Sequence, residues 1–428
     1  MGSAPEFPTT ATGYESVLAA VIERTVGPQA AEIDRNGTFP RDSVQALGDA
    51  GLLGLISAPQ VGGGGGSLAA AAQVIESVGA RCASTAMVVL MHYAAVSVIE
   101  AHGPQDVRRA IARGDHLSSL AFSEVGSRSH FWAPLGTATA GEGDTVQLDA
   151  RKSWVTSAGQ ADSYVWSSRP LAGAGGMAQG GMTQGGMTQG GMTQGGMTQG
   201  GMTQGGMTQG GMTQGGMTLW LVPSKAQGLR VAGKFDGLGL RGNASSPVSG
   251  VDVVVPASAR LGDDGAGLDI ALATALPHFV VLNAALSLGI MEALVAEAGA
   301  HLARTKLQHL GQTLAELPVP RAAFARLRVR TDEVRAFLRD TLAALSTGRD
   351  DATLRTLEIK AVAAEAAAEV ADGVLRLCGG AAFRKELGVE RLFRDALAAR
   401  AMAPTTEALH DMIGRSCLGM PLFDSADR

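Results

Sequence analysis

The stretch RKSWVTSAGQAD, residues 151–162, is the part of the chain that indicates its fold most clearly. It continues a run from residue 145 that is rich in β-branched and aromatic residues, and it ends in a glycine-containing turn. Such runs are typical of β-strands. Similar runs occur at residues 118–123, 163–168, 219–222, 229–231 and 251–255. Together they predict a compact β domain over residues 118–263.

Helical periodicity lies on both sides of this β region. Before it, apolar residues recur at helical spacing and predict helices at residues 14–34, 41–50, 67–79, 83–102 and 104–113. After it, Ala/Leu-rich helices are predicted at about 268–305, 321–345 and 352–377. The order predicts an α+β fold with an N-terminal helical domain (1–117), a β domain (118–263) and a C-terminal helical domain (264–428).

The composition limits the classes of function. Hydrophobic residues make up 46% of the 428 residues and the net charge is −5, which gives no electrostatic reason to bind nucleic acid. Cys82, Cys378 and Cys417 are far apart and in no ligand spacing, so no metal site is predicted. Because neither a leader nor an uninterrupted apolar stretch of about 18 residues occurs, we expect a cytoplasmic protein without a membrane span.

One segment has low complexity: Gly-Gly-Met-Thr-Gln repeats in register over residues 175–218. The repeat has no charge and no continuous apolar face, so a flexible connection between two predicted strands is expected. Thioether sulfurs are soft ligands, and a Cu(I) site is the alternative, although such sites usually combine closer Met spacing with His or Cys. We expect the repeat to contribute little to function.

Five short segments occur in a fixed order. They are AFSEVGSRS (121–129), RKSWVTSAGQAD (151–162), GLRG (239–242), the pair Gly379-Gly380, and ERLFRD (390–395). As an ordered set they resemble the acyl-CoA dehydrogenase family across nearly the whole chain, apart from the repeat. The resemblance implies helical, β and helical domains, the last a four-helix bundle, with FAD between the sheet and the C-terminal helices. It also implies a homodimer or homotetramer.

The resemblance further implies which residues contact the cofactor. The first two segments match those that contact and flank the flavin ring, where an aromatic face and fixed hydrogen-bond partners tune the cofactor. For the Trp of the second segment, packing in a β sandwich is the alternative. The residues that match cofactor contacts are Phe122, Ser123, Ser129, Trp154, Val155, Thr156, Arg304, Gly379 and Gly380. Arg304 belongs to a segment that, in the family, reaches the flavin of a neighbouring subunit.

The largest departure from the family concerns the catalytic base. An acyl-CoA dehydrogenase removes a proton from the carbon next to the thioester carbonyl, which requires a positioned carboxylate. The family's Glu-Gly pair, counted from Arg394-Asp395, falls here on Ala403-Pro404, and neither residue accepts a proton. Glu407 is the nearest candidate base, and a surface glutamate is the alternative interpretation.

A second resemblance suggests different chemistry. Residues 405–411, TTEALHD, are similar to a T-x-x-L-H-D stretch of dibenzothiophene monooxygenase and related oxygenases of the same fold, which use reduced flavin and O₂. His410 and His92 match the histidines of those enzymes, and imidazole exchanges protons near neutral pH. Core packing for His92 and a surface position for His410 are the alternative.

Three functions therefore remain open. The first is an FAD-dependent oxidoreductase that acts on an acyl-CoA thioester and passes electrons to an electron-transfer flavoprotein. The second is a monooxygenase that receives reduced flavin, FAD or FMN, from a flavin reductase. The third is a non-catalytic flavin-binding or assembly protein. The candidate catalytic residues are His92, His410 and Glu407.

Overall fold

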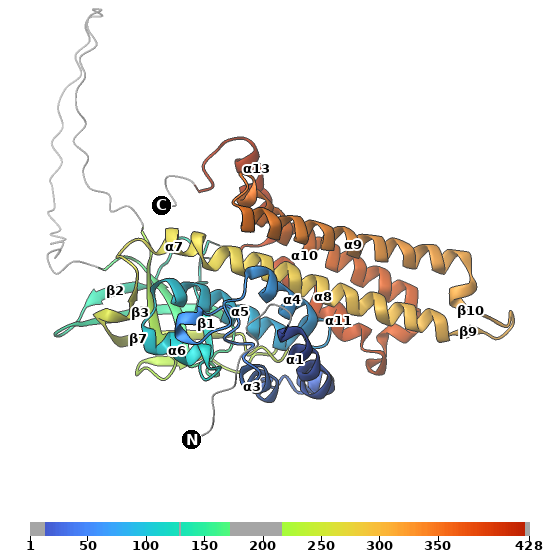
Figure 1. Cartoon of the computed structure of the whole chain (residues 1–428), viewed down its shortest axis with the longest axis horizontal. Helices are drawn as coiled ribbons and strands as arrows, with labels where there is room; N and C mark the ends of the chain where they lie inside the picture. Colours follow the sequence, from blue (N-terminus) through green and yellow to red (C-terminus); the bar gives the residue numbers. More distant parts are fainter. Residues whose placement is uncertain (1–12, 128–129, 172–215, 424–428) are drawn as a thin grey trace, which may run out of the picture.

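Helices, a β region and a second set of helices follow one another along the chain (Figure 1). The computed structural model describes residues 13–127, 130–171 and 216–423. Helices predominate up to residue 112 and again from residue 267, and strands lie between them. The predicted α+β arrangement is confirmed.

One helix of the N-terminal region, α5, is buried along most of its length. The helices of this region are α1 (Tyr14–Val21), α2 (Gly27–Asn36), α3 (Arg41–Asp49), α4 (Leu68–Gly79), α5 (Ala83–His102) and α6 (Gln105–Ala112). A π-helical turn, Ile22–Val26, joins α1 to α2, so the chain stays helical at Gly27-Pro28. Every residue of α5 from Ala83 to Ile99 is buried. A helix that is apolar on all sides requires such surroundings.

Two helical stretches, Ala83–His102 and Gly267–Arg304, are long and apolar enough to cross a membrane by length and composition. In both, most of the apolar window is buried inside the protein, 89% and 78% respectively. Their composition is therefore accounted for by their position in the protein core.

The β region contains two four-stranded sheets. One has the strand order β1-β4-β5-β8 and the other β2-β3-β7-β6. Their bounds are β1 (Ser118–Ala121), β2 (Thr137–Ala140), β3 (Thr145–Val155), β4 (Ser163–Ser168), β5 (Thr218–Pro223), β6 (Leu229–Val231), β7 (Ser246–Pro256) and β8 (Arg260–Leu261). Strand β1 pairs with β4 in parallel, and the other pairs are antiparallel.

The predicted flexible repeat falls mostly outside the described residues, because residues 172–215 are not described. The strands on either side of it, β4 and β5, pair in antiparallel register from Ser163 opposite Pro223 to Ser168 opposite Thr218. The chain therefore leaves β4 and enters β5 at the same end of these two central strands.

Three long helices run side by side in the C-terminal region (Figure 1). The helices of this region are α7 (Gly267–Ala273), α8 (Ala275–Arg304), α9 (Pro318–Thr347), α10 (Ala352–Cys378), α11 (Val389–Ala396), α12 (Ala398–Ala401) and α13 (Thr406–Cys417). A short hairpin of β9 (Lys306–Leu307) and β10 (Gln312–Thr313) joins α8 to α9. The sequence predicts one helix where α7 and α8 lie. The chain breaks at Thr274 because Pro277, three residues later, has no N–H for the carbonyl of Ala273.

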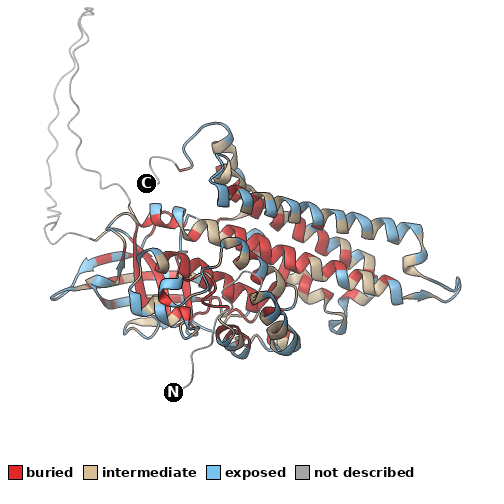
Figure 2. Cartoon of the chain, viewed as in Figure 1, coloured by how far each residue is buried: buried red, intermediate tan, exposed pale blue. Residues whose placement is uncertain are grey.

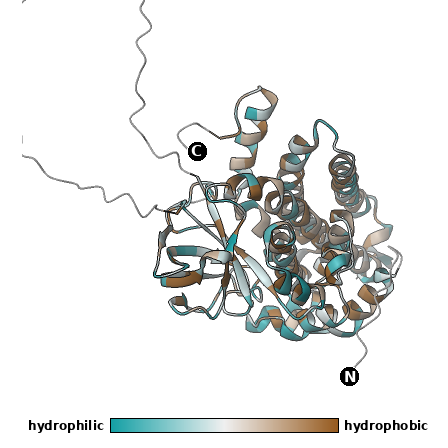
Figure 3. Ribbon diagram, turned by 60° about the vertical axis from the view of Figure 1, so that its left-hand side comes forward, coloured by the Kyte–Doolittle hydropathy of each residue, from teal (hydrophilic) through white to brown (hydrophobic). Residues whose placement is uncertain are grey.

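Helix α8 forms the centre of the molecule. It packs against α4, α5, α9 and α10, and its middle is buried, whereas much of α9 is exposed (Figure 2). Viewed nearly along their axes, the long helices carry hydrophobic residues on the faces that meet (Figure 3). Helix α5, which packs against α8, also contacts β1 and β4 of the β region.

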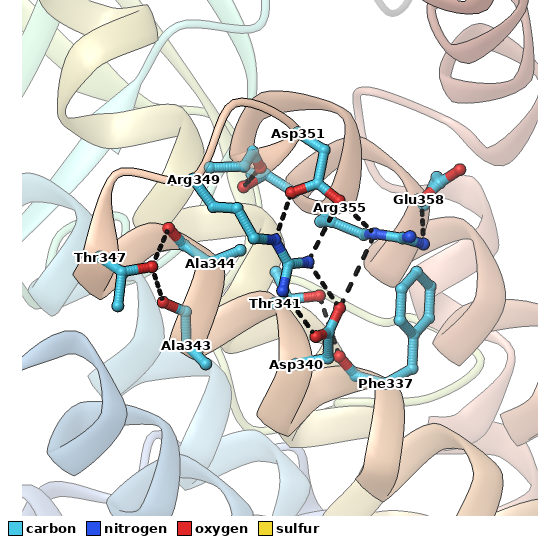
Figure 4. Close-up of polar contacts among 12 residues, drawn as sticks. Phe337, Asp340, Thr341, Ala343, Ala344, Thr347, Arg349, Asp351, Arg355 and Glu358 are labelled. Carbon is cyan, nitrogen blue, oxygen red and sulfur yellow. Dashed lines mark hydrogen bonds and ion pairs between the residues drawn. The ribbon is translucent and has the colours of Figure 1, made fainter.

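The turn between α9 and α10 is held by a network of charges (Figure 4). The guanidinium of Arg349 donates two hydrogen bonds of 2.8 Å to Asp340 and also bonds Asp351, which in turn accepts one of 3.0 Å from Arg355. Arg349 lowers the pKa of both carboxyl groups, largely by hydrogen bonding. Gly348 ends α9 in the left-handed conformation, φ +64°. The network holds the end of α9 against the start of α10, so that the two helices run antiparallel. Its residues do not line the cavity described below.

Candidate functional site

A large cavity lies where the β region meets the C-terminal helices. Its volume is about 1260 Å³. Lining residues come from α5, β1, the residues after β1, β3, the segment 235–245, the start of the α7–α8 pair, and residues 394–423. The three segments that the sequence singles out at residues 121–129, 151–162 and 239–242 all contribute to it.

Four residues on the β side, Phe122, Ser123, Trp154 and Thr156, form what we call the β wall. The two segments that carry them lie side by side, because Ser153 N donates to Ser123 O at 2.9 Å and Val125 N donates to Arg151 O at 3.0 Å. The first two predicted segments are therefore one structural unit.

Trp154 presents its side chain to the cavity. The register of β3 with β7 shifts between Lys152 and Val155, and such irregularities redirect side chains from the regular alternation of a strand. Trp154 is 68% exposed, whereas the next residue, Val155, is buried and does not line the cavity. The hydroxyl of Thr156 hydrogen-bonds that of Ser245 at 3.0 Å.

A buried ion pair lies directly behind the β wall. Lys152 Nζ donates to Glu124 Oε1 at 2.5 Å and to the carbonyl and hydroxyl oxygens of Ser167 at 2.7 and 2.8 Å. Glu124 Oε2 accepts from the backbone N–H groups of Leu135 and Gly136 at 2.6 and 2.9 Å. Both side chains are almost completely buried. The pair ties the segment after β1 to β3 and to β4.

The third segment is bent into the cavity by α11. Leu240 has a left-handed backbone, φ +51°, and its N–H donates to Asp395 Oδ1 at 2.6 Å. Burial raises the pKa of Asp395 to about 6. The neighbouring Arg394 pairs with Asp34 at 2.6 Å and donates to Leu238 O at 2.9 Å. These contacts fix Leu238 to Leu240 as part of the cavity lining.

The opposite side of the cavity, the C-terminal wall, consists of the lining residues between positions 397 and 415. Ala403 is one of them, so this position lines the cavity and offers a methyl group. The carboxylates of this wall, among the described residues, are Glu407 and Asp411. Both come from α13.

The segment 399–404 is held from behind by a second buried lysine. Lys360 Nζ, on α10, donates to the carbonyl oxygens of Ala399, Met402 and Pro404 at 2.9, 3.1 and 2.8 Å. Its side chain is fully buried, and burial lowers its pKa to about 7. Three carbonyl acceptors match the three donors of an ammonium group. Lys360 therefore determines the path of the chain around Ala403.

Glu407 lies in the first turn of α13. Thr405 caps this helix, with its hydroxyl accepting from Ala408 N at 3.4 Å. The Glu407 pKa lies below its usual range because the carboxylate accepts hydrogen bonds from its own backbone N–H and from Thr405. The carboxylate is exposed and lines the cavity one helical turn before Asp411, which pairs with Arg415 at 2.9 Å.

The structure does not bring His92 and His410 together at the cavity. His92 is completely buried on α5, where Nε2 bonds Leu53 O at 3.1 Å and Nδ1 accepts from Ser118 N at 3.1 Å. Burial lowers its pKa to about 4, so the ring is neutral and both nitrogens are engaged. His410 is exposed on α13, and neither histidine lines the cavity. The packing interpretation of His92 fits these contacts.

Other predicted contact residues lie away from this cavity or outside the described residues. Arg304 is exposed at the end of α8, and Gly379 and Gly380 are exposed after α10. None of the three lines the cavity. Ser129 lies outside the described residues.

Sequence reasoning missed two features of the site. Lys360 belongs to no sequence motif, because its partners are backbone carbonyls, which any residue type provides. It also did not assign Phe131, Trp132 and Phe423 to the site, although all three line the cavity. The sequence contains one signal for this group: residues 130–132 are three consecutive residues with aromatic rings, in a chain with only 4% Phe, Trp and Tyr.

The residues present fit a flavin. The cavity exceeds the roughly 300–1,000 Å³ that drug-sized ligands require, which leaves room for a cofactor and a substrate. Its β wall combines an exposed indole with the Ser123 and Thr156 hydroxyls. A planar aromatic face beside fixed polar groups is suited to a flavin ring.

Two family models match the chain. The acyl-CoA dehydrogenase N-terminal domain matches residues 14–114, and the acyl-CoA dehydrogenase C-terminal domain matches residues 265–418. The human mitochondrial short-chain specific acyl-CoA dehydrogenase is 25% identical over 410 residues, which cover 94% of this chain and 88% of that protein.

Solved structures share the fold. Butyryl-CoA dehydrogenase from Megasphaera elsdenii is 20% identical and has a TM-score of 0.80. The match covers 97% of this chain and 100% of that one. KijD3, in complex with FMN and a dTDP-linked amino sugar, is 22% identical with a TM-score of 0.76, over 98% of this chain and 96% of that one. The predicted resemblance is thus confirmed: the chain belongs to the acyl-CoA dehydrogenase family of flavin-dependent oxidoreductases.

Proposed function

We propose that the protein is an FAD-dependent dehydrogenase of an acyl thioester in which Glu407 replaces the family's usual base. One observation carries this proposal. The family position, Ala403, lines the cavity without an acid, while Glu407 lines the same cavity four residues later. The family and its relatives support an acyl-CoA thioester as the substrate class.

The β wall would hold the cofactor. Trp154 offers a ring face, Phe122 a second apolar contact, and Ser123 and Thr156 polar groups. Bound FAD supplies the acceptor for the hydride that leaves the substrate. FAD is the form we propose, and FMN is the alternative, which identification of the flavin released from purified protein would distinguish.

Glu407 would take the proton from the carbon next to the thioester carbonyl. Its carboxylate is ionised at neutral pH, the form that accepts a proton, and its lowered pKa makes it a weaker base than an ordinary glutamate. Among the ion pairs of the described residues, Asp411 of the same wall is engaged with Arg415, whereas Glu407 forms none. We therefore assign the proton transfer to Glu407 rather than to Asp411.

The oxygenase remains a second candidate, supported by a different histidine. His130 lines the cavity and packs edge-on against Trp132 at 4.9 Å between ring centroids. An enzyme of this kind would require reduced flavin from a reductase, and His130 rather than His92 or His410 would exchange the proton. The non-catalytic alternative predicts no turnover of either kind.

A homodimer or homotetramer also belongs to the proposal. Arg304, Gly379 and Gly380 match cofactor contacts but are exposed outside their own chain's cavity. They would contact flavin only across a subunit interface. For the dehydrogenase we propose an electron-transfer flavoprotein as electron acceptor, and for the oxygenase a flavin reductase.

Anaerobic absorbance spectroscopy tests the proposed reaction. The purified flavoprotein should be bleached by an acyl-CoA under argon, and Glu407→Gln should slow bleaching by a factor on the order of 10² to 10⁴. Glu386→Gln is the matched control, because Glu386 is also exposed and its pKa is also lowered by its own backbone N–H. Bleaching by no acyl-CoA, with product formed only in air and with a reductase, would instead favour the oxygenase.

A further inference from the structure

Aromatic residues are concentrated around the cavity. Phenylalanine, tryptophan and tyrosine make up only 4% of the chain, yet five of its 11 phenylalanines and two of its 4 tryptophans line this one cavity. They are Phe122, Phe131, Trp132, Trp154, Phe235, Phe279 and Phe423. Two of them belong to the β wall, so the proposed cofactor site does not account for the others.

Four rings, those of His130, Phe131, Trp132 and Phe423, form what we call the aromatic cluster. Trp132 lies at its centre. Its ring centroid is 5.2 Å from that of Phe131 at an interplanar angle of 84°, and 4.7 Å from that of Phe423 at 46°. These are the separations at which aromatic pairs attract beyond the area they bury. The cluster thus joins the β region to the end of the C-terminal segment.

The aromatic cluster is backed by a small hydrophobic core of its own. Phe131, Trp132 and Phe423 pack with Leu357 and Ala361 of α10 and with Leu409 and Met412 of α13. All seven residues are at least nine-tenths buried. The rings are therefore held from behind by two helices, and their orientation toward the cavity is fixed.

The aromatic cluster adjoins the proposed base. Leu409 and Met412, which support the rings, belong to α13, the helix that carries Glu407. Met412 and Ala408 line the cavity, as do the rings and the carboxylate. A substrate in this cavity would therefore meet both the carboxylate and the rings, because α13 carries Glu407 and supports the rings.

We infer that the acyl group of the substrate carries an aromatic ring, and that Trp132 and Phe423 select for it. The simplest member of this class is a 3-phenylpropanoyl thioester. Glu407 would take a proton from C2 and bound flavin a hydride from C3, which leaves a C2–C3 double bond conjugated with the ring. The thioester in this inference rests on the proposed function, whereas the ring rests on the aromatic cluster.

Calorimetric binding to the flavin-loaded protein tests the preference. We would compare 3-phenylpropanoyl-CoA with octanoyl-CoA, whose acyl group has similar apolar size. Each ring contact should favour the aryl ligand by about 2- to 10-fold, so the wild type should bind it at least several-fold more tightly. Trp132→Leu and Phe423→Leu should each reduce the ratio of the two dissociation constants toward 1.

Phe324→Leu is the matched control, because Phe324 packs on Gly299 of α8 and does not line the cavity. It should leave the ratio unchanged. Equal or tighter binding of octanoyl-CoA by the wild type would overturn the inference, as would a preference that persists in both variants. If Trp132→Leu does not fold, the wild-type ratio and Phe423→Leu still decide. An aryl preference without bleaching by either thioester would contradict the proposed reaction and leave the ring inference standing.

Discussion

The two sides of the cavity each rest on a buried lysine, but the two ammonium groups are compensated differently. Lys152, behind the β wall, is paired with the Glu124 carboxylate, and Lys360, behind the C-terminal wall, donates to three backbone carbonyls. Burial lowers the pKa of both, to about 8 and about 7. The more depressed value belongs to Lys360, whose pKa is raised only by the charge of Glu407, whereas Lys152 also hydrogen-bonds its carboxylate.

The contacts of Lys360 show that a wall can lack an acid at position 403 and still keep a defined conformation. The β wall presents an indole and two hydroxyl groups to the cavity, whereas the C-terminal wall presents Ala403, the position at which we propose that the family's base is missing. A buried ammonium group is costly unless its donors are satisfied, and Lys360 satisfies them only if the segment 399–404 follows its present path. The wall without the usual base is therefore still held in a defined conformation.

The largest expected effect comes from breaking the ion pair of the β wall. Glu124→Ala leaves the Lys152 ammonium buried without its carboxylate, and it should lower the free energy of unfolding by about 3–5 kcal/mol. Urea denaturation measures it. The double variant Glu124→Gln, Lys152→Met removes both charges and should cost clearly less. An equal loss in both would mean that packing rather than charge holds this wall.

The buried, neutral imidazole of His92 should make the stability of the fold depend on pH. The folded-state pKa of His92, about 4, lies below the usual 6.5 because the ring is buried. Between these pH values the unfolded chain binds more protons, so stability falls as the pH falls. Relative to His92→Gln, the wild type should lose about 3 kcal/mol of unfolding free energy between pH 6.5 and 4.

Chemical denaturation at several pH values measures this difference, and the contributions of other titrating groups cancel between the two proteins. Flavin bleaching by an acyl-CoA at pH 7.5 should change little in His92→Gln. A large loss of turnover with no change in acid stability would restore a catalytic role for His92.

The C-terminal wall should respond more mildly to loss of its lysine. Lys360→Met leaves three carbonyls without their donor but also removes a buried charge, so we expect a loss of about 2 kcal/mol in unfolding free energy. The turnover rate should fall more than the substrate affinity, because the path of the chain before Glu407 changes. Lys306→Met, at an exposed position, should alter stability by less than about 0.5 kcal/mol. Unchanged turnover in Lys360→Met would contradict a positioning role.

Much of the fold could be predicted because its signals are local. Apolar periodicity and turn residues indicate the order of helices and strands. The break before α8 was missed because the apolar pattern continues through Thr274, although Pro277 is itself a local signal that can end a helix there. Trp154 and Thr156 could be assigned to the site since they belong to one ordered segment, and both line the cavity.

The C-terminal side of the site could not be predicted in the same way. Lys360 contacts backbone atoms 39 to 44 residues away, and any residue type provides the same carbonyls. The aromatic cluster joins residues 130–132 to residue 423, a pairing that only the fold creates. His92 resembled a catalytic residue in sequence, yet its partners are the backbone groups of Leu53 and Ser118.

The rate of anaerobic flavin bleaching by an acyl-CoA, measured in four proteins, tests most directly whether the proton acceptor has moved from position 403 to α13. The proteins are the wild type, Glu407→Gln, Ala403→Glu and the double variant. We expect Glu407→Gln to be slowed by a factor on the order of 10² or more, and the double variant to recover part of that loss through the carboxylate restored at the cavity. Wild-type rates in Glu407→Gln would contradict the account.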